Sequence, residues 1–286
     1  MMKAISIVIP VFNEEKAIGE VIEKTKNVFL STNRDFEIIV VDDGSVDNTG
    51  RIAEEKGARV IRHPINAGYG RAILKGIENA KYDLIGMMDG DGSYNPEDFL
   101  KLLEFSNEFD MVIGARKGVH YRGSILKQPA REIFQWMAQY VTGEKIPDVN
   151  SGMRIFKKGI IEKISHIICP GFSFSTTLTL NLLRQGCFVK FVPIQYHKRK
   201  GRSHVRYIRD TLRTGQILTE TLLYFNPIKA ILPLVGISFI LSLILFLLWL
   251  FLGKDLWIGL AIISFLSSLN LFAIGLTMDL MRMKQK

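Results

Sequence analysis

Short apolar runs alternate with helix-like patterns along the first part of the chain. Runs rich in β-branched residues predict strands at 4–10, 36–41, 58–62, 84–88 and 111–114. Between these runs, apolar residues recur at the spacing of an amphipathic helix, for example at Ile18, Val21, Ile22 and Val28. Strands that are apolar almost throughout are typical of a parallel sheet with helices on both faces. The pattern therefore predicts an α/β fold with a mostly parallel sheet.

Two long apolar runs follow near the C-terminus, at 228–252 and 256–280. Each reaches about the 20 residues that a membrane-spanning helix needs. The first run has no charged residue between Lys229 and Lys254, which is more than the core of a soluble protein requires. We expect a transmembrane hairpin, and a buried helix pair of a soluble protein is the alternative.

Two further segments have the periodicity of amphipathic helices, at 125–141 and 207–225. The first is equally compatible with packing on the protein core and with lying at a membrane surface. The second leads directly into the first apolar run, which favours the membrane surface. The predicted organisation is a globular domain at 1–205, a juxtamembrane helix at 206–227 and a hairpin at 228–286.

The net charge of +9 is concentrated close to the hairpin. Residues 184–213 contain nine Lys or Arg against the single acid Asp210, and further basic residues follow the second apolar run. A hairpin places both basic segments on one face, which the positive-inside rule assigns to the cytoplasm. We therefore expect an integral membrane protein with a cytoplasmic globular domain that contacts the lipid bilayer. No nucleic-acid recognition motif accompanies the charge, so we expect no nucleic-acid partner.

Asp89 and Asp91 directly follow the fourth predicted strand and point to the same side of an extended chain. By themselves they suit a polar turn as well as a metal site. Polar residues also follow the first two strands, and open α/β sheets bind ligands at the carboxyl ends of their strands. This placement favours a site for Mg²⁺ or Mn²⁺, with a phosphate-bearing substrate completing the coordination.

Three other loops carry groups that suit phosphates. The glycine-rich loop at 66–70 precedes a predicted helix, whose N-terminus could contact a phosphate, although it lacks the ending of a P-loop. The loop at 148–154 includes Arg154, and a guanidinium matches phosphate oxygens in pairs. The loop at 196–203 is basic and includes Arg199 and Arg202.

Six motifs, at 9–14, 41–45, 66–68, 89–91, 150–154 and 196–203, occur in the order found in family 2 glycosyltransferases. Over about 5–203 the chain resembles the polyprenyl-phosphate glycosyltransferases similar to dolichol-phosphate mannose synthase. The resemblance implies a Rossmann-like GT-A domain that transfers a sugar, with inversion, from a nucleotide-sugar to polyprenyl phosphate. It also implies a Mg²⁺ or Mn²⁺ cofactor and a reaction at the cytoplasmic membrane face.

The resemblance implies roles for individual residues as well. Asp89 and Asp91 would hold the metal on the diphosphate, and Arg199 would close over it. Arg154 would approach the acceptor or donor phosphate. The donor-binding set would comprise Pro10, Val11, Asn13, Glu14, Asp42, Asp43, Asn66, Gly68, Arg116, Ser151, Arg202 and Ser203.

The expected acceptor, a lipid phosphate, would not need a strong general base. A phosphomonoester has a second pKa of about 6, so a lipid phosphate is mostly dianionic at neutral pH and could attack the anomeric carbon directly. Asp148 is the candidate general base, and it would matter more for a lipid acceptor with a hydroxyl group. The alternatives are transfer to another membrane lipid and a non-catalytic subunit that binds nucleotide-sugar. A homo-oligomer formed through the spans is possible.

Three positions depart from the family pattern. Ser93 stands where relatives often have Gln, and His204 stands where a Lys is common. The segment 172–177 lacks an acid that is often present in the corresponding helix. These departures favour a UDP-sugar slightly over GDP-mannose.

Overall fold

The computed structural model describes residues 4–118, 128–164, 174–199, 215–216, 219–220, 222–223 and 226–284. The chain divides into two compact units, Met1–Thr214 and Gly215–Lys286. The boundary predicted at residue 205 and most of the predicted juxtamembrane helix lie outside the described residues, so this part of the organisation stays a prediction.

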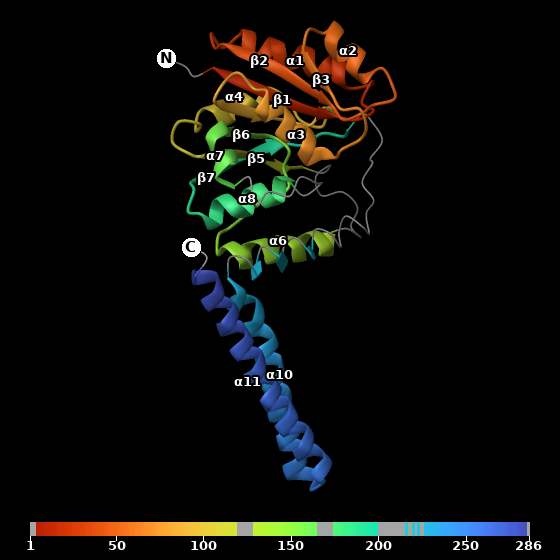
Figure 1. The fold of residues 1–286 in the computed structure, drawn as a ribbon. Helices are drawn as coiled ribbons and strands as arrows, with labels where there is room; N and C mark the ends of the chain where they lie inside the picture. Colours follow the sequence, from red (N-terminus) through yellow and green to blue (C-terminus); the bar gives the residue numbers. More distant parts are fainter. Residues whose placement is uncertain are drawn as a thin grey trace. The chain divides into compact units, whose positions relative to one another are not determined.

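A seven-stranded sheet forms the centre of the first unit, in the order β3-β2-β1-β4-β6-β5-β7 (Figure 1). Its strands are β1 (Ile5–Val11), β2 (Phe36–Asp42), β3 (Arg59–Arg62), β4 (Leu84–Met87), β5 (Met111–Lys117), β6 (Arg154–Lys157) and β7 (Val189–Gln195). β6 runs antiparallel to its neighbours β4 and β5, whereas the other pairs are parallel. The five predicted strands and the mostly parallel sheet are confirmed, and β6 and β7 were not predicted.

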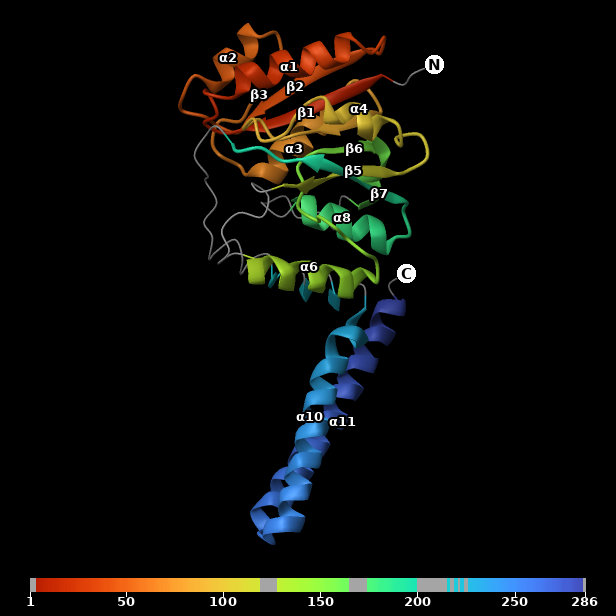
Figure 2. The ribbon, with the colours of Figure 1, turned by 180° about the vertical axis from the view of Figure 1, so that it is seen from behind.

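Helices cover both faces of this sheet. They are α1 (Ile18–Leu30), α2 (Thr49–Glu55), α3 (Tyr69–Glu78), α4 (Asp98–Leu103), α7 (Lys158–Ile164) and α8 (Phe174–Arg184). A further helix, α6 (Gln128–Thr142), packs on α8. Figures 1 and 2 show α1 and α2 on one side of the strands and α3 and α8 on the other. The predicted helix at 125–141 corresponds to α6 in its described part.

The alternation of side chains along β1 divides the core into two parts. Ile5, Ile7 and Ile9 join a cluster with the apolar faces of α1 and α4, whereas Val8 joins a cluster with α3, α7 and α8. Helix α3 packs closely on β1, since a Cβ on Gly76 would lie 2.3 Å from Cγ1 of Val8. All seven residues of β1 are buried, which explains why this strand is apolar throughout.

The register of the parallel strands determines which loops meet. Val11 pairs with Asp42 and Val8 pairs with Met87, so β1, β2 and β4 end close together. The loops that follow these strands therefore lie at one edge of the sheet, which is where an open α/β sheet binds its ligands.

The second unit is a helical hairpin of α10 (Pro227–Leu252) and α11 (Asp255–Lys284). Gly253 ends α10 in the left-handed conformation, with φ +63°, which permits the short turn. Ser238 and Ser264 each donate a hydrogen bond to the backbone carbonyl of the other, at 2.9 and 3.0 Å, and these bonds join the two helices.

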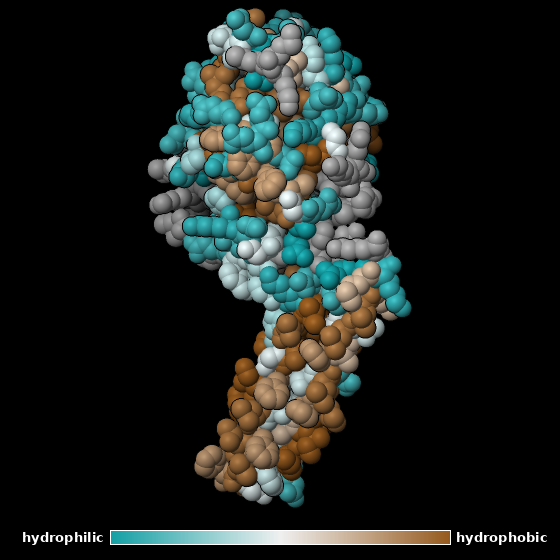
Figure 3. Space-filling model, turned by 90° about the vertical axis from the view of Figure 1, so that its left-hand side faces the viewer, coloured by the Kyte–Doolittle hydropathy of each residue, from teal (hydrophilic) through white to brown (hydrophobic). Residues whose placement is uncertain are grey.

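The outer surface of this hairpin is apolar, as its brown colour in Figure 3 shows. Large apolar side chains are exposed along both helices, including Ile237, Phe251 and Ile263, and few side chains are buried. A buried helix pair in a soluble protein would cover these side chains, so the two helices are candidate membrane spans by length, composition and exposure.

Candidate active site

Asp89 and Asp91 lie at the carboxyl end of β4. Oδ1 of Asp89 accepts a hydrogen bond from the Tyr69 hydroxyl at 2.7 Å, and Oδ1 of Asp91 accepts one from the backbone N–H of Ser93 at 2.9 Å. Burial, together with the charge of Asp91, raises the pKa of Asp89 to about 6. The two carboxylates thus repel each other, and a cation between them would relieve this repulsion.

The pair suits a divalent metal in its chemistry. Carboxylate oxygens are the ligands that Mg²⁺ and Mn²⁺ prefer. Within the described residues, no cluster of three His, Cys, Asp or Glu residues is placed to bind a metal. Asp89 and Asp91 would therefore supply part of a coordination shell, and substrate oxygens or water would supply the rest.

Gly152 forms a wall of the site beside Asp89. A Cβ on Gly152 would lie 2.6 Å from both carboxylate oxygens of Asp89, so only glycine fits at this position. The backbone N–H of Gly152 donates to the Tyr94 hydroxyl at 2.7 Å, and the Ser151 hydroxyl donates to the carbonyl of Gly114 at 2.6 Å. These bonds hold the loop before β6 against the acid pair.

Arg199 joins the loop after β1 to the acid pair. Its guanidinium forms an ion pair with Oε1 of Glu14, and its Nε lies 3.4 Å from Oδ2 of Asp91. Burial raises the pKa of Glu14, although the charge of Arg199 opposes this effect. The second oxygen of Glu14, Oε2, is buried, and no residue in the described part of the chain donates a hydrogen bond to it. A bound ligand with an N–H or O–H group would satisfy this oxygen.

The loops after β1 and β2 hold each other in place. Asn13 has a φ of +56°; its N–H donates to the Ser45 hydroxyl at 2.9 Å, and its side-chain oxygen accepts from the N–H of Val46 at 2.9 Å. Asp42 accepts from the N–H of Ser45 at 2.8 Å and from Nε of Arg62 at 3.1 Å. Asn13 and Asp42 therefore shape the predicted nucleotide pocket. A direct contact of either residue with a nucleotide stays a prediction.

Asp43 organises the glycine-rich loop. Its buried carboxylate accepts hydrogen bonds from the N–H groups of Ala67 at 2.9 Å and Gly68 at 2.8 Å, and it lies 2.7 Å from Nδ1 of His63. The loop at 66–68 is thereby tied to the carboxyl end of β2. Of the other predicted donor-binding residues, Asn66 is exposed at this edge, while Pro10 and Val11 are buried at the end of β1.

Arg116 and Asp148 form a bidentate ion pair. Nε and a terminal nitrogen of Arg116 donate to the two carboxylate oxygens of Asp148 at 2.8 and 3.0 Å. Burial alone would raise the pKa of Asp148, but the Arg116 guanidinium prevails and lowers it. Both oxygens are occupied and the group stays ionised, so this geometry favours a structural role for Asp148 over the predicted role as general base.

Arg154 is the first residue of β6. Its side chain is fully buried, and it donates to the carbonyls of Ser151 at 2.8 Å and Val149 at 2.9 Å and to the Thr179 hydroxyl at 2.8 Å. Burial lowers the pKa of Arg154 to about 10. This geometry favours a role in holding the loop that carries Ser151 and Gly152. The direct contact of Arg154 with a phosphate stays a prediction.

Four residues remain to be compared with the site predicted from the sequence. Arg202 and Ser203 lie outside the described residues. Tyr69 and Tyr94 contact the site and were missed, because tyrosines beside glycine-rich loops also suit the apolar core. The position of Tyr69 directly after Gly68 was a signal that could have identified it.

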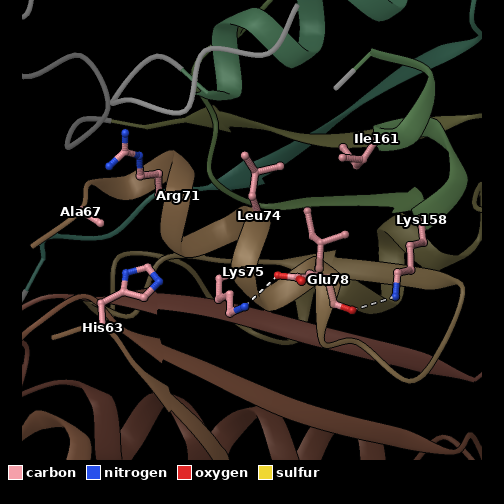
Figure 4. Close-up of a pocket in the computed structure, with 9 residues that line it drawn as sticks. His63, Ala67, Arg71, Leu74, Lys75, Glu78, Lys158 and Ile161 are labelled. Atoms are coloured by element: carbon pink, nitrogen blue, oxygen red, sulfur yellow. Dashed lines mark hydrogen bonds and ion pairs between the residues drawn. The ribbon is translucent and has the colours of Figure 1, made fainter. Parts of the chain in front are cut away.

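A pocket of about 680 Å³ lies on another face of α3 (Figure 4). It is lined by apolar side chains such as Leu74 and Ile161, with Arg71 and Lys158 among its basic residues. Lys158 donates to the backbone carbonyls of 78 and 80, at 3.2 and 3.0 Å. The acid pair does not line this pocket, but His63 and Ala67 do, and both contact the Asp43 carboxylate.

Several curated proteins are similar to the chain in sequence. Undecaprenyl-phosphate 4-deoxy-4-formamido-L-arabinose transferase of Pseudomonas aeruginosa is 27% identical, and the alignment covers 95% of this chain and 83% of that protein. Low-salt glycan biosynthesis hexosyltransferase Agl6 of Haloferax volcanii is 32% identical over 73% of this chain and 51% of that protein.

Solved structures share the fold, and a family model matches the sequence. Glucosyl-3-phosphoglycerate synthase from Mycobacterium tuberculosis, crystallised with Mn²⁺, UDP-glucose and phosphoglyceric acid, aligns with a TM-score of 0.63 at 19% identity over 77% of this chain and 80% of that chain. Mannosyl-3-phosphoglycerate synthase from Rubrobacter xylanophilus aligns with a TM-score of 0.60 at 19% identity, over 77% and 72%. The model named "Glycosyl transferase family 2" matches residues 6–165, more than half of the chain. The chain therefore belongs to glycosyl transferase family 2.

Proposed function

We propose that this protein transfers a sugar from a nucleotide-sugar to polyprenyl phosphate at a membrane surface. One observation carries the proposal: in a chain with a candidate membrane hairpin, Arg199 joins Glu14 to the acid pair at the carboxyl edge of the sheet. Curated relatives named as transferases of sugars to undecaprenyl phosphate support the acceptor class.

The acid pair, through a bound metal ion, and Arg199 would stabilise the negative charge of the leaving nucleotide diphosphate. Asp89 and Asp91 would hold a Mg²⁺ or Mn²⁺ ion, which supplies electrostatic stabilisation of the leaving group when it is bound. Arg199 carries a delocalised charge and several donors, and its partners Glu14 and Asp91 keep it at this edge. The unpartnered Oε2 of Glu14 would accept a hydrogen bond from the nucleotide.

The acceptor phosphate would attack the anomeric carbon directly and invert it. The geometry of Asp148 agrees with this route, because each of its oxygens already accepts two hydrogen bonds, from Arg116 and the N–H of Asn150, and burial beside Arg116 keeps it from the solvent. A dianionic phosphate does not need a strong base. We favour a UDP-sugar as donor from the sequence departures at Ser93 and 172–177, with GDP-mannose as the second choice.

We place the hairpin in the bilayer and the first unit in the cytoplasm. Helix α6 would lie at the membrane surface, since Trp136 is 63% exposed and stacks on Tyr140 with 5.5 Å between ring centroids. Ala138 is buried, and Gln135 donates to the carbonyls of Ile146 and Pro147, so another face of the helix packs within its own unit.

Purified full-length protein in lipid nanodiscs provides the test. Radiolabelled UDP-sugars and GDP-mannose are offered with Mn²⁺ and either polyprenyl phosphate or diacylglycerol, and we expect transfer to polyprenyl phosphate alone. Asp91→Ala should abolish the transfer. Asp83→Ala, which removes an exposed acid before the other end of β4, should leave it unchanged.

Each negative outcome points to a different alternative. Transfer to diacylglycerol alone would replace the proposed acceptor with a neutral lipid. Binding of a nucleotide-sugar without transfer or hydrolysis would indicate a non-catalytic subunit.

A further inference from the structure

Tyr69 makes a direct hydrogen bond to one of the two proposed metal ligands. It is the first residue of α3, and its hydroxyl donates to Oδ1 of Asp89 at 2.7 Å. The phenol thereby binds one of the two oxygens of this carboxylate, Oδ1. A single hydrogen bond to one oxygen is a means of fixing the rotation of a carboxylate.

The backbone at Gly152 also approaches the Asp89 carboxylate closely. A Cβ on Gly152 would lie 2.6 Å from each of its oxygens, so this wall has no room for the carboxylate to turn toward it. Asp89 is therefore restrained by both the Tyr69 hydroxyl and Gly152. Of these two constraints, only the first is a side-chain hydrogen bond that a single atom change can remove.

The position of Tyr69 depends in turn on the loop after β2. Asp43 accepts from the N–H groups of Ala67 and Gly68, the two residues directly before Tyr69. Gly68 has a φ of +101°, a backbone conformation that residues other than glycine rarely adopt. This conformation sets the direction in which α3 begins. A continuous set of contacts thus leads from Asp43, in the proposed donor pocket, to Asp89.

We propose that Tyr69 is a positioning residue that orients Asp89 for a divalent cation and connects the metal site to the Asp43 loop. The inference rests on the proposed function, because it requires that Asp89 and Asp91 bind a cation. Tyr69 itself does not touch the cation. Partners of metal ligands at this distance typically change metal affinity by about 10- to 100-fold when they are removed.

The test measures Mn²⁺ binding directly, by the electron paramagnetic resonance signal of free Mn²⁺, on full-length protein with and without UDP. Tyr69→Phe should lower Mn²⁺ affinity about tenfold or more. Tyr82→Phe removes a phenol hydroxyl before the other end of β4, and its affinity should equal that of the wild type. Replacing Tyr69 with 4-aminophenylalanine, which keeps a donor at a similar reach, should restore most of the affinity.

The outcomes separate the inference from the proposed function. If Asp89→Asn binds Mn²⁺ as the wild type does, the proposed metal site is wrong. If Asp89→Asn loses Mn²⁺ while Tyr69→Phe matches Tyr82→Phe, only the role of Tyr69 is wrong. Should Tyr69→Phe fold poorly, the 4-aminophenylalanine protein decides: wild-type affinity supports the hydrogen bond, and a tenfold loss in a protein of wild-type Tm contradicts it.

Discussion

Three arginines contribute to the candidate site, and burial separates their roles. The side chain of Arg154 is fully buried, that of Arg116 is 17% exposed and that of Arg199 is 28% exposed. A guanidinium that has no access to solvent does not meet an incoming diphosphate, so residue type alone does not assign the role. Of these three arginines, Arg199 is therefore the one that we expect to contact the leaving group.

Arg154→Ala is expected to destabilise the first unit. It removes the donor to the carbonyls of Ser151 and Val149 and to the Thr179 hydroxyl, and a buried acceptor left without a partner costs about 1–3 kcal/mol. A loss of ~3 kcal/mol corresponds to a Tm lower by roughly 10 °C in a unit of this size, measured by thermal unfolding in detergent.

Asp91→Ala should lose activity without losing stability, and so serves as the comparison for Arg154→Ala. Because it removes one of the two carboxylates that repel each other, Asp89 and Asp91, its Tm should stay close to that of the wild type while transfer is lost. An Arg154→Ala protein that unfolds at the wild-type temperature and lacks activity would instead support a direct catalytic contact by Arg154.

At the scale of elements, the turn into β6 brings a distant segment to the acid pair. β6 pairs with both β4 and β5, with Gly86 opposite Ile155 and Val112 opposite the same residue. The residues just before β6 therefore arrive beside those just after β4. This pairing explains how Gly152 comes to lie against Asp89 although more than 60 residues separate them in the chain.

Gly152→Ala is expected to impair the metal site, because the added Cβ would lie 2.6 Å from the Asp89 carboxylate and must displace it or the turn. We expect Mn²⁺-dependent transfer to fall by about tenfold or more, as for loss of a metal-ligand partner. Gly159→Ala is the matched control, since its added Cβ meets no atom within 4 Å. Equal transfer rates for the two alanine variants would show that the close approach at Gly152 does not matter.

At the scale of the whole molecule, the distribution of charge supports the orientation that we propose for the hairpin in the bilayer. The hairpin carries Lys254 and Asp255 at its turn, and the many basic residues at 184–213 precede its first helix. Both proposed substrates are anionic, and a cytoplasmic basic face would attract them as well as anionic lipid headgroups. The orientation of the hairpin therefore bears directly on the proposed reaction.

Cysteine labelling of intact cells tests this orientation. In a protein carrying Cys169→Ser and Cys187→Ser, the thiol introduced by Lys254→Cys should react with a membrane-impermeant maleimide added outside. The thiol introduced by Lys145→Cys, at an exposed position of the first unit, should react only after the cells are opened. The reverse pattern would place the catalytic unit outside and contradict the positive-inside prediction.

Much of the fold follows from local patterns in the sequence. β1, β2, β4 and β5 were predicted because a strand buried on both faces must be apolar throughout, and the hairpin because a span needs an uninterrupted apolar run. β6 was missed because Arg154 begins it, and a charged residue seldom enters a buried strand. β7 was missed because only two of its seven residues are buried and it includes Lys190 and Pro193.

The sequence by itself determined the first five strands with the helices between them, the two apolar helices and the acid pair at the end of β4, since each depends on neighbours along the chain. Only the tertiary structure decided which loops meet. Arg199 reaches Glu14 across 185 positions, Tyr69 reaches Asp89, and Arg154 turns inward. These contacts depend on strand order and on the antiparallel insertion of β6, and no local periodicity encodes them.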